Sequence, residues 1–172
     1  IQMVLALAPL HKAFKIKRLI ISTYQSITGT GVKAVAQLKN EAEGKDGDMA
    51  YPHPIHKNAL PHCDVFLEND YTKEEMKLVW ETKKILDPNI DVQATCARVP
   101  VFNGHSEAVF LKMSNDASRE DIIKTVQGNE GVCVMDNPET LEYPTPYEQA
   151  NDSEDVYVGR IRSQNIQGDT WV

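Results

Sequence analysis

Helix-like and strand-like segments follow one another in this sequence without strict alternation, and this order constrains the fold most strongly. The run Arg18–Tyr24 is short, rich in β-branched residues and bounded by polar residues, which predicts a buried strand. Further strands are predicted at Asp91–Val101, Ala108–Met113, Val132–Met135 and Val156–Arg162. Because helices do not separate every pair of these strands, the order favours an α+β fold with a mixed, largely antiparallel sheet over a doubly wound parallel sheet.

Four segments carry the signals of helices. Residues Ile1–Phe14 form a wide apolar stripe at helical spacing, and Pro9 lies inside it, so the helix either kinks at Pro9 or ends just before it. Apolar residues also recur at helical spacing over Val32–Gly44. Thr72–Glu75 has the form of a capping box, and Ser118–Asp121 resembles another helix cap, so each predicts a helix start.

Length and charge limit the kind of molecule this can be. The 172 residues give room for one domain, 1–172, and too little for two ordinary ones. With 18 Lys and Arg against 25 Asp and Glu, the net charge of −7 argues against a nucleic-acid or anionic-membrane partner. No apolar run reaches the ~20 residues of a spanning helix, and no secretory signal or disulfide framework is visible. We therefore expect a cytoplasmic protein that binds a small molecule or another protein.

Two polar residues stand out near the third predicted helix and its following strand. Arg98 continues the apolar face of its strand, where an unpaired guanidinium is costly, so it must reach solvent or meet an anion. A neighbouring carboxylate is the simpler partner, and a bound carboxylate or phosphate the more interesting one. His105 lies in the turn Asn103–Glu107 between two strands, where it is either a general base or a solvated loop histidine.

Three further side chains are candidates for contacts with a substrate. Gln25 ends the first predicted strand, so its amide either faces a substrate carbonyl or holds the following turn. Glu74 and Lys77 are three residues apart on one helix and share a face, where they can bind an amino group and an anion side by side. An ordinary surface ion pair explains the same spacing.

Two other patterns are weak. Gly29-Thr30-Gly31 lacks the third glycine and the downstream acidic residue of a dinucleotide-binding fingerprint, so we reject nucleotide binding there. The irregular stretch 44–61 and its neighbourhood contain several potential metal ligands, but their spacing matches no closed zinc site: His53, His56, His62 and Cys63. We therefore predict no metal.

The order of several motifs resembles one enzyme family. The segments Ser22–Gly31, Asp64–Asn69, Tyr71–Lys77 and Arg98–Glu107 closely resemble the catalytic and dimerisation domain of the aspartate-semialdehyde dehydrogenase family, and Val158–Arg162 agrees as well. The resemblance covers nearly the whole chain. It implies a fold like the C-terminal domain of glyceraldehyde-3-phosphate dehydrogenase, with helices packed on one face of the sheet.

The resemblance also implies a reaction and assigns roles to the candidates. Family members reduce aspartyl β-phosphate with NADPH through a cysteine thioester, giving aspartate semialdehyde and phosphate for lysine, methionine and threonine biosynthesis. By this resemblance, Arg98 holds the substrate α-carboxylate and His105 is the general acid and base. Gln25 orients the acyl group, Glu74 binds the α-amino group, and Lys77 binds the phosphate.

The same resemblance exposes what this sequence lacks. The family's nucleophilic cysteine precedes the helix that starts here at Ile1, and Cys63, Cys96 and Cys133 do not occupy that motif. The NADP-binding domain and a closing C-terminal helix are also missing, so we expect the chain to be a piece of a longer polypeptide that is inactive alone. The family forms homodimers through its sheet. Two alternatives stay open: a related acyl-phosphate reductase, such as one acting on N-acetyl-glutamyl phosphate, and a non-catalytic dimerising paralogue.

Overall fold

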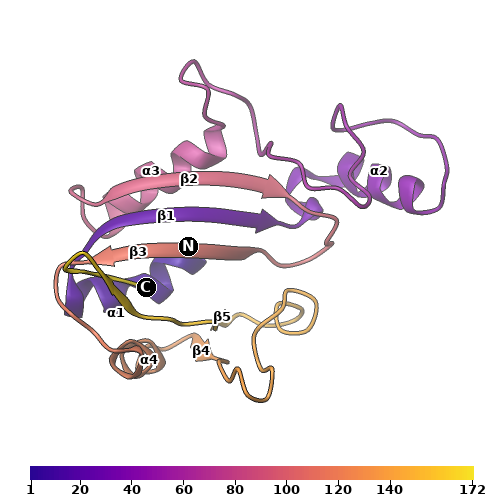
Figure 1. The fold of residues 1–172 in the computed structure, drawn as a ribbon. Helices are drawn as coiled ribbons and strands as arrows, with labels where there is room; N and C mark the ends of the chain where they lie inside the picture. Colours follow the sequence, from indigo (N-terminus) through magenta and orange to yellow (C-terminus); the bar gives the residue numbers. More distant parts are fainter.

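A five-stranded sheet forms the centre of the computed structural model, which describes all residues 1–172 (Figure 1). Its strands lie in the order β2 (Asp91–Arg98), β1 (Ile16–Gln25), β3 (Ser106–Met113), β7 (Asp169–Trp171) and β6 (Gln164–Ile166). Strands β1 and β2 are parallel, and all other neighbours are antiparallel. The expected α+β fold with a mixed, largely antiparallel sheet is confirmed.

The two faces of this sheet differ in burial. On β1, Leu19 and Ile21 are fully buried, whereas Ile20 between them is 44% exposed. Helices α1 (Gln2–Phe14) and α3 (Lys73–Ile85) lie behind the sheet in Figure 1 and contribute to the main core. The expected packing of helices on one face is therefore confirmed, and the opposite face is left open.

The C-terminal third adds a smaller layer. Helix α4 (Arg119–Gln127) packs against α1 and leads into a two-stranded parallel sheet of β4 (Val132–Val134) and β5 (Val156–Val158). The prediction that β5 continues to Arg162 is wrong. The buried Asp136 carboxylate accepts the backbone N–H groups of Arg160 and Ile161 at 2.9 and 3.0 Å, which takes this segment out of the strand ladder.

The second predicted strand is also shorter than expected, because it ends at Arg98 instead of Val101. Pro100 has no backbone N–H to donate to a ladder, and the chain turns there. Strand β6 was not predicted. Its residues Gln164–Ile166 are all exposed and carry no alternating pattern that could reveal a strand.

A separate lobe forms around α2 (Val32–Ala42), which stands apart from the sheet in Figure 1. It has a second apolar core made by Ile27, Ala34, Leu38, Tyr51, Ile55 and Leu60. Two α2 side chains hold the irregular stretch that follows. Gln37 Oε1 accepts the N–H of Ala50 at 2.7 Å, and Glu41 Oε2 accepts the N–H of Ile55 at 2.7 Å.

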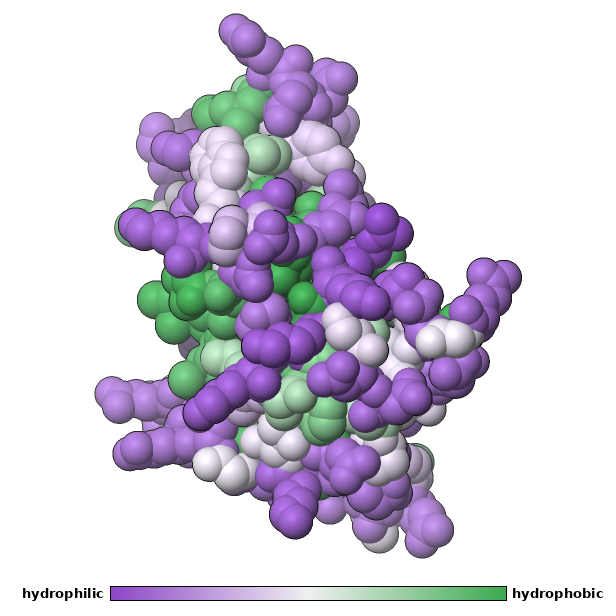
Figure 2. Space-filling model, turned by 90° about the vertical axis from the view of Figure 1, so that its left-hand side faces the viewer, coloured by the Kyte–Doolittle hydropathy of each residue, from purple (hydrophilic) through white to green (hydrophobic).

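The surface carries mixed polarity, and none of the helices has the length and apolar character needed to cross a bilayer. Figure 2 shows one face on which polar residues predominate, with a group of apolar residues exposed near its middle.

Helix α1 continues through Pro9, which settles the choice that the sequence leaves open. A proline at this position leaves the carbonyl of Leu5 without its normal helical donor. The side chain of Asn129 supplies that donor, with Nδ2 at 2.9 Å from the Leu5 oxygen. A residue far along the chain therefore makes an unbroken helix possible.

We predict that Asn129→Ala lowers the free energy of unfolding by about 1–2 kcal/mol, because it leaves a partly buried carbonyl without its donor. Pro9→Ala restores the backbone donor, so Asn129→Ala should cost clearly less in the Pro9→Ala protein. Urea denaturation of the four proteins of this double-mutant cycle measures the difference. Equal costs in both backgrounds would contradict this account of Pro9.

Candidate active site

The sheet topology brings three of the predicted site residues to one edge. Strands β1 and β2 are parallel and in register from Arg18 to Gln25, so Gln25 pairs with Arg98 at their shared carboxyl ends. Strand β3 is antiparallel to β1 and begins at Ser106 opposite Tyr24, which places His105 at the same edge. The pairing of these three strands therefore explains how residues distant in sequence come together at one end of the sheet.

Arg98 is buried, with 6% of its area exposed, and it has no carboxylate partner. Its Nη1 donates to the carbonyl of Ser26 at 2.8 Å, and its buried Nε has no hydrogen-bond partner. The neighbouring-carboxylate alternative is therefore not realised in this structure. A buried guanidinium with unused donors is suited to an anion.

Gly29 makes room for this arginine. A Cβ atom at Gly29 would lie 2.8 Å from Arg98 Nη1, closer than normal contact allows. Gly29 lies in the short helix η1 (Ile27–Thr30), and its missing side chain thus accommodates the guanidinium. This contact gives the glycine a role that does not involve a nucleotide.

His105 is held through one ring nitrogen. Its Nδ1 accepts the backbone N–H of Ser26 at 3.0 Å. Partial burial of the ring and the nearby Arg98 guanidinium lower the pKa of His105 below its ordinary value, against the opposing effects of the Gly104 carbonyl and Glu74. The imidazole is therefore mainly neutral at pH 7.

Gln25, Glu74 and Lys77 form a continuous polar chain beside Arg98. Gln25 Nε2 lies 3.4 Å from Glu74 Oε1, and Lys77 Nζ lies 2.8 Å from Glu74 Oε2. The hydrogen bond to Glu74 raises the pKa of Lys77. The simple ion pair that the spacing allowed is present, but it also contacts Gln25, so it belongs to the same site.

Glu75 is a site residue whose wider role the sequence did not reveal. It completes the capping box of α3, in which Glu75 Oε2 accepts the N–H of Thr72 at 2.7 Å. Its other oxygen, Oε1, accepts the N–H of Cys96 on β2 at 2.9 Å. One buried carboxylate therefore joins the helix that carries Glu74 to the strand that carries Arg98.

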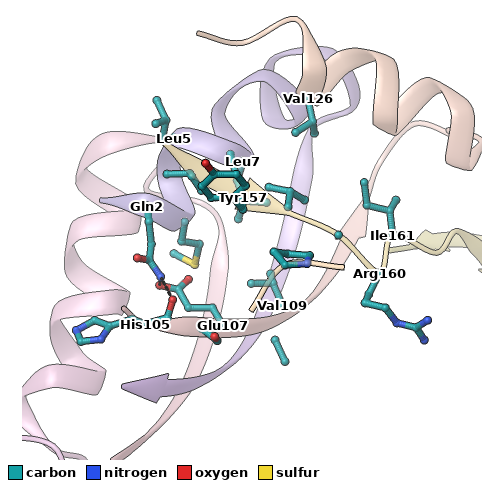
Figure 3. Close-up of a pocket in the computed structure, with 18 of the residues that line it drawn as sticks. Gln2, Leu5, Leu7, His105, Glu107, Val109, Val126, Tyr157, Arg160 and Ile161 are labelled. Carbon is teal, nitrogen blue, oxygen red and sulfur yellow. Dashed lines mark hydrogen bonds between the residues drawn. The ribbon is translucent and has the colours of Figure 1, made fainter. Parts of the chain in front are cut away.

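Glu107 is a second residue that sequence analysis missed. It extends the core-facing side of β3, and burial raises the pKa of its carboxyl group. Gln2 Nε2 donates to Glu107 Oε1 at 2.9 Å, which joins the start of α1 to β3. Figure 3 shows Gln2, His105 and Glu107 together at one end of a groove of about 1300 Å³, whose walls are mostly apolar. Its position on a core-facing strand could have singled out this carboxylate.

The three thiols do not have the properties of a nucleophile. Burial raises the pKa of Cys63 to about 12 and that of Cys96 to about 11. The pKa of Cys133 is also raised, by desolvation and by Asp155. A reactive cysteine requires a lowered pKa, so none of them is an activated thiol.

One histidine of the histidine-rich stretch, His62, packs by aromatic contacts. His62 stacks on Phe66, with ring centroids 4.8 Å apart, and meets the edge of Tyr51 at 5.6 Å. No group of three or more His, Cys, Asp and Glu side chains is arranged to hold a metal ion.

Comparison with known proteins places this geometry in a family. A family model described as the dimerisation domain of semialdehyde dehydrogenase matches residues 7–172. The chain belongs to the semialdehyde dehydrogenase family. This semialdehyde dehydrogenase domain is similar to the aspartate-semialdehyde dehydrogenase of Aquifex aeolicus, with 47% identity over 173 residues, covering 96% of this chain and 51% of that protein. The Legionella pneumophila enzyme is 46% identical, covering 94% and 48%.

Solved structures of the semialdehyde dehydrogenase family agree in fold. Aspartate semialdehyde dehydrogenase II from Vibrio cholerae, complexed with ASA, gives a TM-score of 0.86 at 34% identity and covers 99% of this chain and 52% of its own. The Candida albicans enzyme with NADP gives 0.69 at 26% identity, covering 99% and 48%. The chain spans about half the length of the relatives it matches.

We predict that Glu75→Ala lowers the free energy of unfolding by about 2–4 kcal/mol, because two buried N–H groups lose their acceptor. Glu75→Gln should cost less, since the amide oxygen still accepts one of the two. Glu81→Ala, on an exposed position of the same helix, is the control and should change stability by less than about 0.5 kcal/mol. Urea denaturation measures the free energy of unfolding of each variant. An equal effect of Glu75→Ala and Glu81→Ala would exclude this role for Glu75.

Proposed function

We propose that this chain is the substrate-binding and dimerisation domain of an NADP-dependent aspartate-semialdehyde dehydrogenase. The reaction converts aspartyl β-phosphate to aspartate semialdehyde and phosphate in amino-acid biosynthesis. One observation carries the proposal: the buried, unpaired guanidinium of Arg98 lies at the sheet edge that also carries Gln25 and His105. Relatives that carry this enzyme name support it.

Arg98 recognises the α-carboxylate of the substrate. Its planar fork can donate two parallel hydrogen bonds to a carboxylate, and its single bond to the Ser26 carbonyl leaves donors for this purpose. Because the guanidinium is already buried, binding the anion removes an electrostatic cost instead of creating one.

The remaining residues act on the other groups of the substrate. Glu74 is a carboxylate suited to an ammonium group, and Lys77 beside it is a point charge suited to a phosphate. Gln25 lies within reach of Glu74 and orients the acyl group through its amide. His105 is the residue that exchanges protons with the reacting groups, and its neutral state at pH 7 suits that role.

The Gly29-Thr30-Gly31 turn does not fit a dinucleotide. The Gly29-Thr30-Gly31 turn packs against Arg98 and offers no phosphate cradle. NADPH supplies the hydride in the proposed reaction, and we assign its binding mainly to the other half of the full-length enzyme. We also propose that the 172 residues alone, without the thiol that forms the thioester, are inactive.

A homodimer would cover the open face of the sheet. Ile20, Tyr24 and Phe110 are each more than 40% exposed on that face, which forms an apolar surface around the paired strands β1 and β3. We propose that a second copy covers it. The absence of nucleic-acid and anionic-membrane partners stays a prediction based on the charge of −7, and a cytoplasmic location stays a separate prediction from the sequence.

We predict that, in the full-length enzyme, His105→Asn lowers kcat by about 10²–10⁴-fold, because a positioned proton-transfer group is lost. Arg98→Leu should raise the KM for aspartate semialdehyde at least about tenfold, since it removes a charge-assisted hydrogen bond. Arg18→Leu, at the opposite end of β1, is the control. The assay follows NADPH formation from aspartate semialdehyde and phosphate.

Unchanged kinetics in both site variants would refute the proposed site. If the unsubstituted full-length protein folds but shows no turnover, the result would instead support a non-catalytic paralogue. A preference for an N-acetylated substrate would favour the related acyl-phosphate reductase, because Glu74 is useful only to a free amino group.

A further inference from the structure

The environment of His105 Nδ1 determines where the neutral ring carries its proton. The backbone N–H of Ser26 points at Nδ1 across 3.0 Å. A backbone N–H can only donate, so Nδ1 must be the acceptor in this bond. A proton on Nδ1 would bring two N–H groups together and leave the Ser26 donor unpaired.

The hydroxyl groups around the ring fit either tautomer. Thr28 Oγ1 donates to the Phe102 carbonyl at 2.6 Å, so its own proton is used. The Ser26 hydroxyl lies 3.2 Å from both Thr28 Oγ1 and His105 Nδ1, so it can donate to either of them. When it donates to Thr28, its oxygen can accept a proton from Nδ1. The backbone N–H of Ser26, which can only donate, is thus the group that decides the tautomer.

We propose that the backbone N–H of Ser26 is a positioning group, which holds neutral His105 with its proton on Nε2. The ring then meets its reaction partner as a hydrogen-bond donor before it accepts any proton. Both hydrogen bonds between the ring and Ser26 use Nδ1, so they leave the Nε2 donor available. Only the identity of that partner, an acyl oxygen or a thiolate in the dehydrogenase reaction, rests on the proposed function.

The role of the neutral ring follows from this tautomer. His105 can donate a hydrogen bond from Nε2 to a developing negative charge while the ring keeps its proton. Direct removal of a thiol proton at Nε2 by the neutral ring would first require the ring proton to move to Nδ1, which breaks the bond to Ser26. The structure therefore favours the neutral ring as a hydrogen-bond donor.

The backbone of Ser26 allows an unusually selective test. Its φ of −62° and ψ of 152° match the conformation that proline requires. The preceding residue, Gln25, is in a strand, and an extended residue is compatible with a following proline. Ser26→Pro therefore removes the N–H donor with little demand on the backbone, whereas Ser26→Ala removes only the hydroxyl and is the matched control.

The experiment is a pH titration of the 15N-labelled 172-residue chain by long-range 1H–15N NMR, with His105→Asn used to assign the ring signals. In the unsubstituted chain and in Ser26→Ala, the neutral ring should carry its proton on Nε2. In Ser26→Pro this preference should weaken, and the pKa of His105 should rise by about half a pH unit or more, because the bond that favours the neutral form is gone. The other groups that act on the ring, Arg98 from β2, Glu74 from α3 and the Gly104 carbonyl, are the same in all these proteins.

Two results would overturn the inference. One is a neutral ring in the unsubstituted chain with its proton on Nδ1, bonded to the Gly104 carbonyl or the Ser26 hydroxyl. The other is a folded Ser26→Pro chain with the same tautomer and the same His105 pKa as the unsubstituted one. If Ser26→Pro does not fold, the tautomer in the unsubstituted chain still decides. Neither result depends on turnover, so failure here is distinguishable from failure of the proposed function.

Discussion

The parallel pairing of β1 with β2 is the constraint on which the rest of the site depends. Because the two strands run in the same direction and in register, their carboxyl ends coincide, and Gln25 and Arg98 become neighbours. The antiparallel β3 then adds its amino end and His105 to that edge. A shift of β2 by one residue would move Arg98 to the open face of the sheet and destroy the site.

Several local contacts hold the side chains at this end of the sheet in place. Glu75 fixes the start of α3 to the outer edge of β2, the Ser26 backbone binds both Arg98 and His105, and Gly29 leaves space for the guanidinium. These contacts satisfy backbone groups and at the same time orient charged side chains. These side chains are therefore positioned by contacts within the chain itself, and positioning of this kind reduces the ordering that binding requires.

The sequence predicts the parts of this arrangement that are local. The alternation that begins at Asp91 correctly predicts a strand with Arg98 on its apolar face, and the capping box at Thr72 correctly predicts the start of α3. Contacts between distant segments are not predictable in this way. The bond between Asn129 and Leu5 that carries α1 through Pro9, and the second bond of Glu75, depend on tertiary packing that one sequence does not specify. The family resemblance assigned roles to five residues, but it did not indicate Ser26 or Glu107.

An NMR titration of the Arg98 side-chain Nε–Hε signal with aspartate semialdehyde in the 172-residue chain tests anion binding at this position. We expect this signal to shift with saturation, since the unpaired Nε of the buried guanidinium lies in the proposed binding site, and the Arg18 signal to stay unchanged. Binding detected elsewhere in the chain with an unmoved Arg98 signal would contradict the claim that this sheet edge is an anion site.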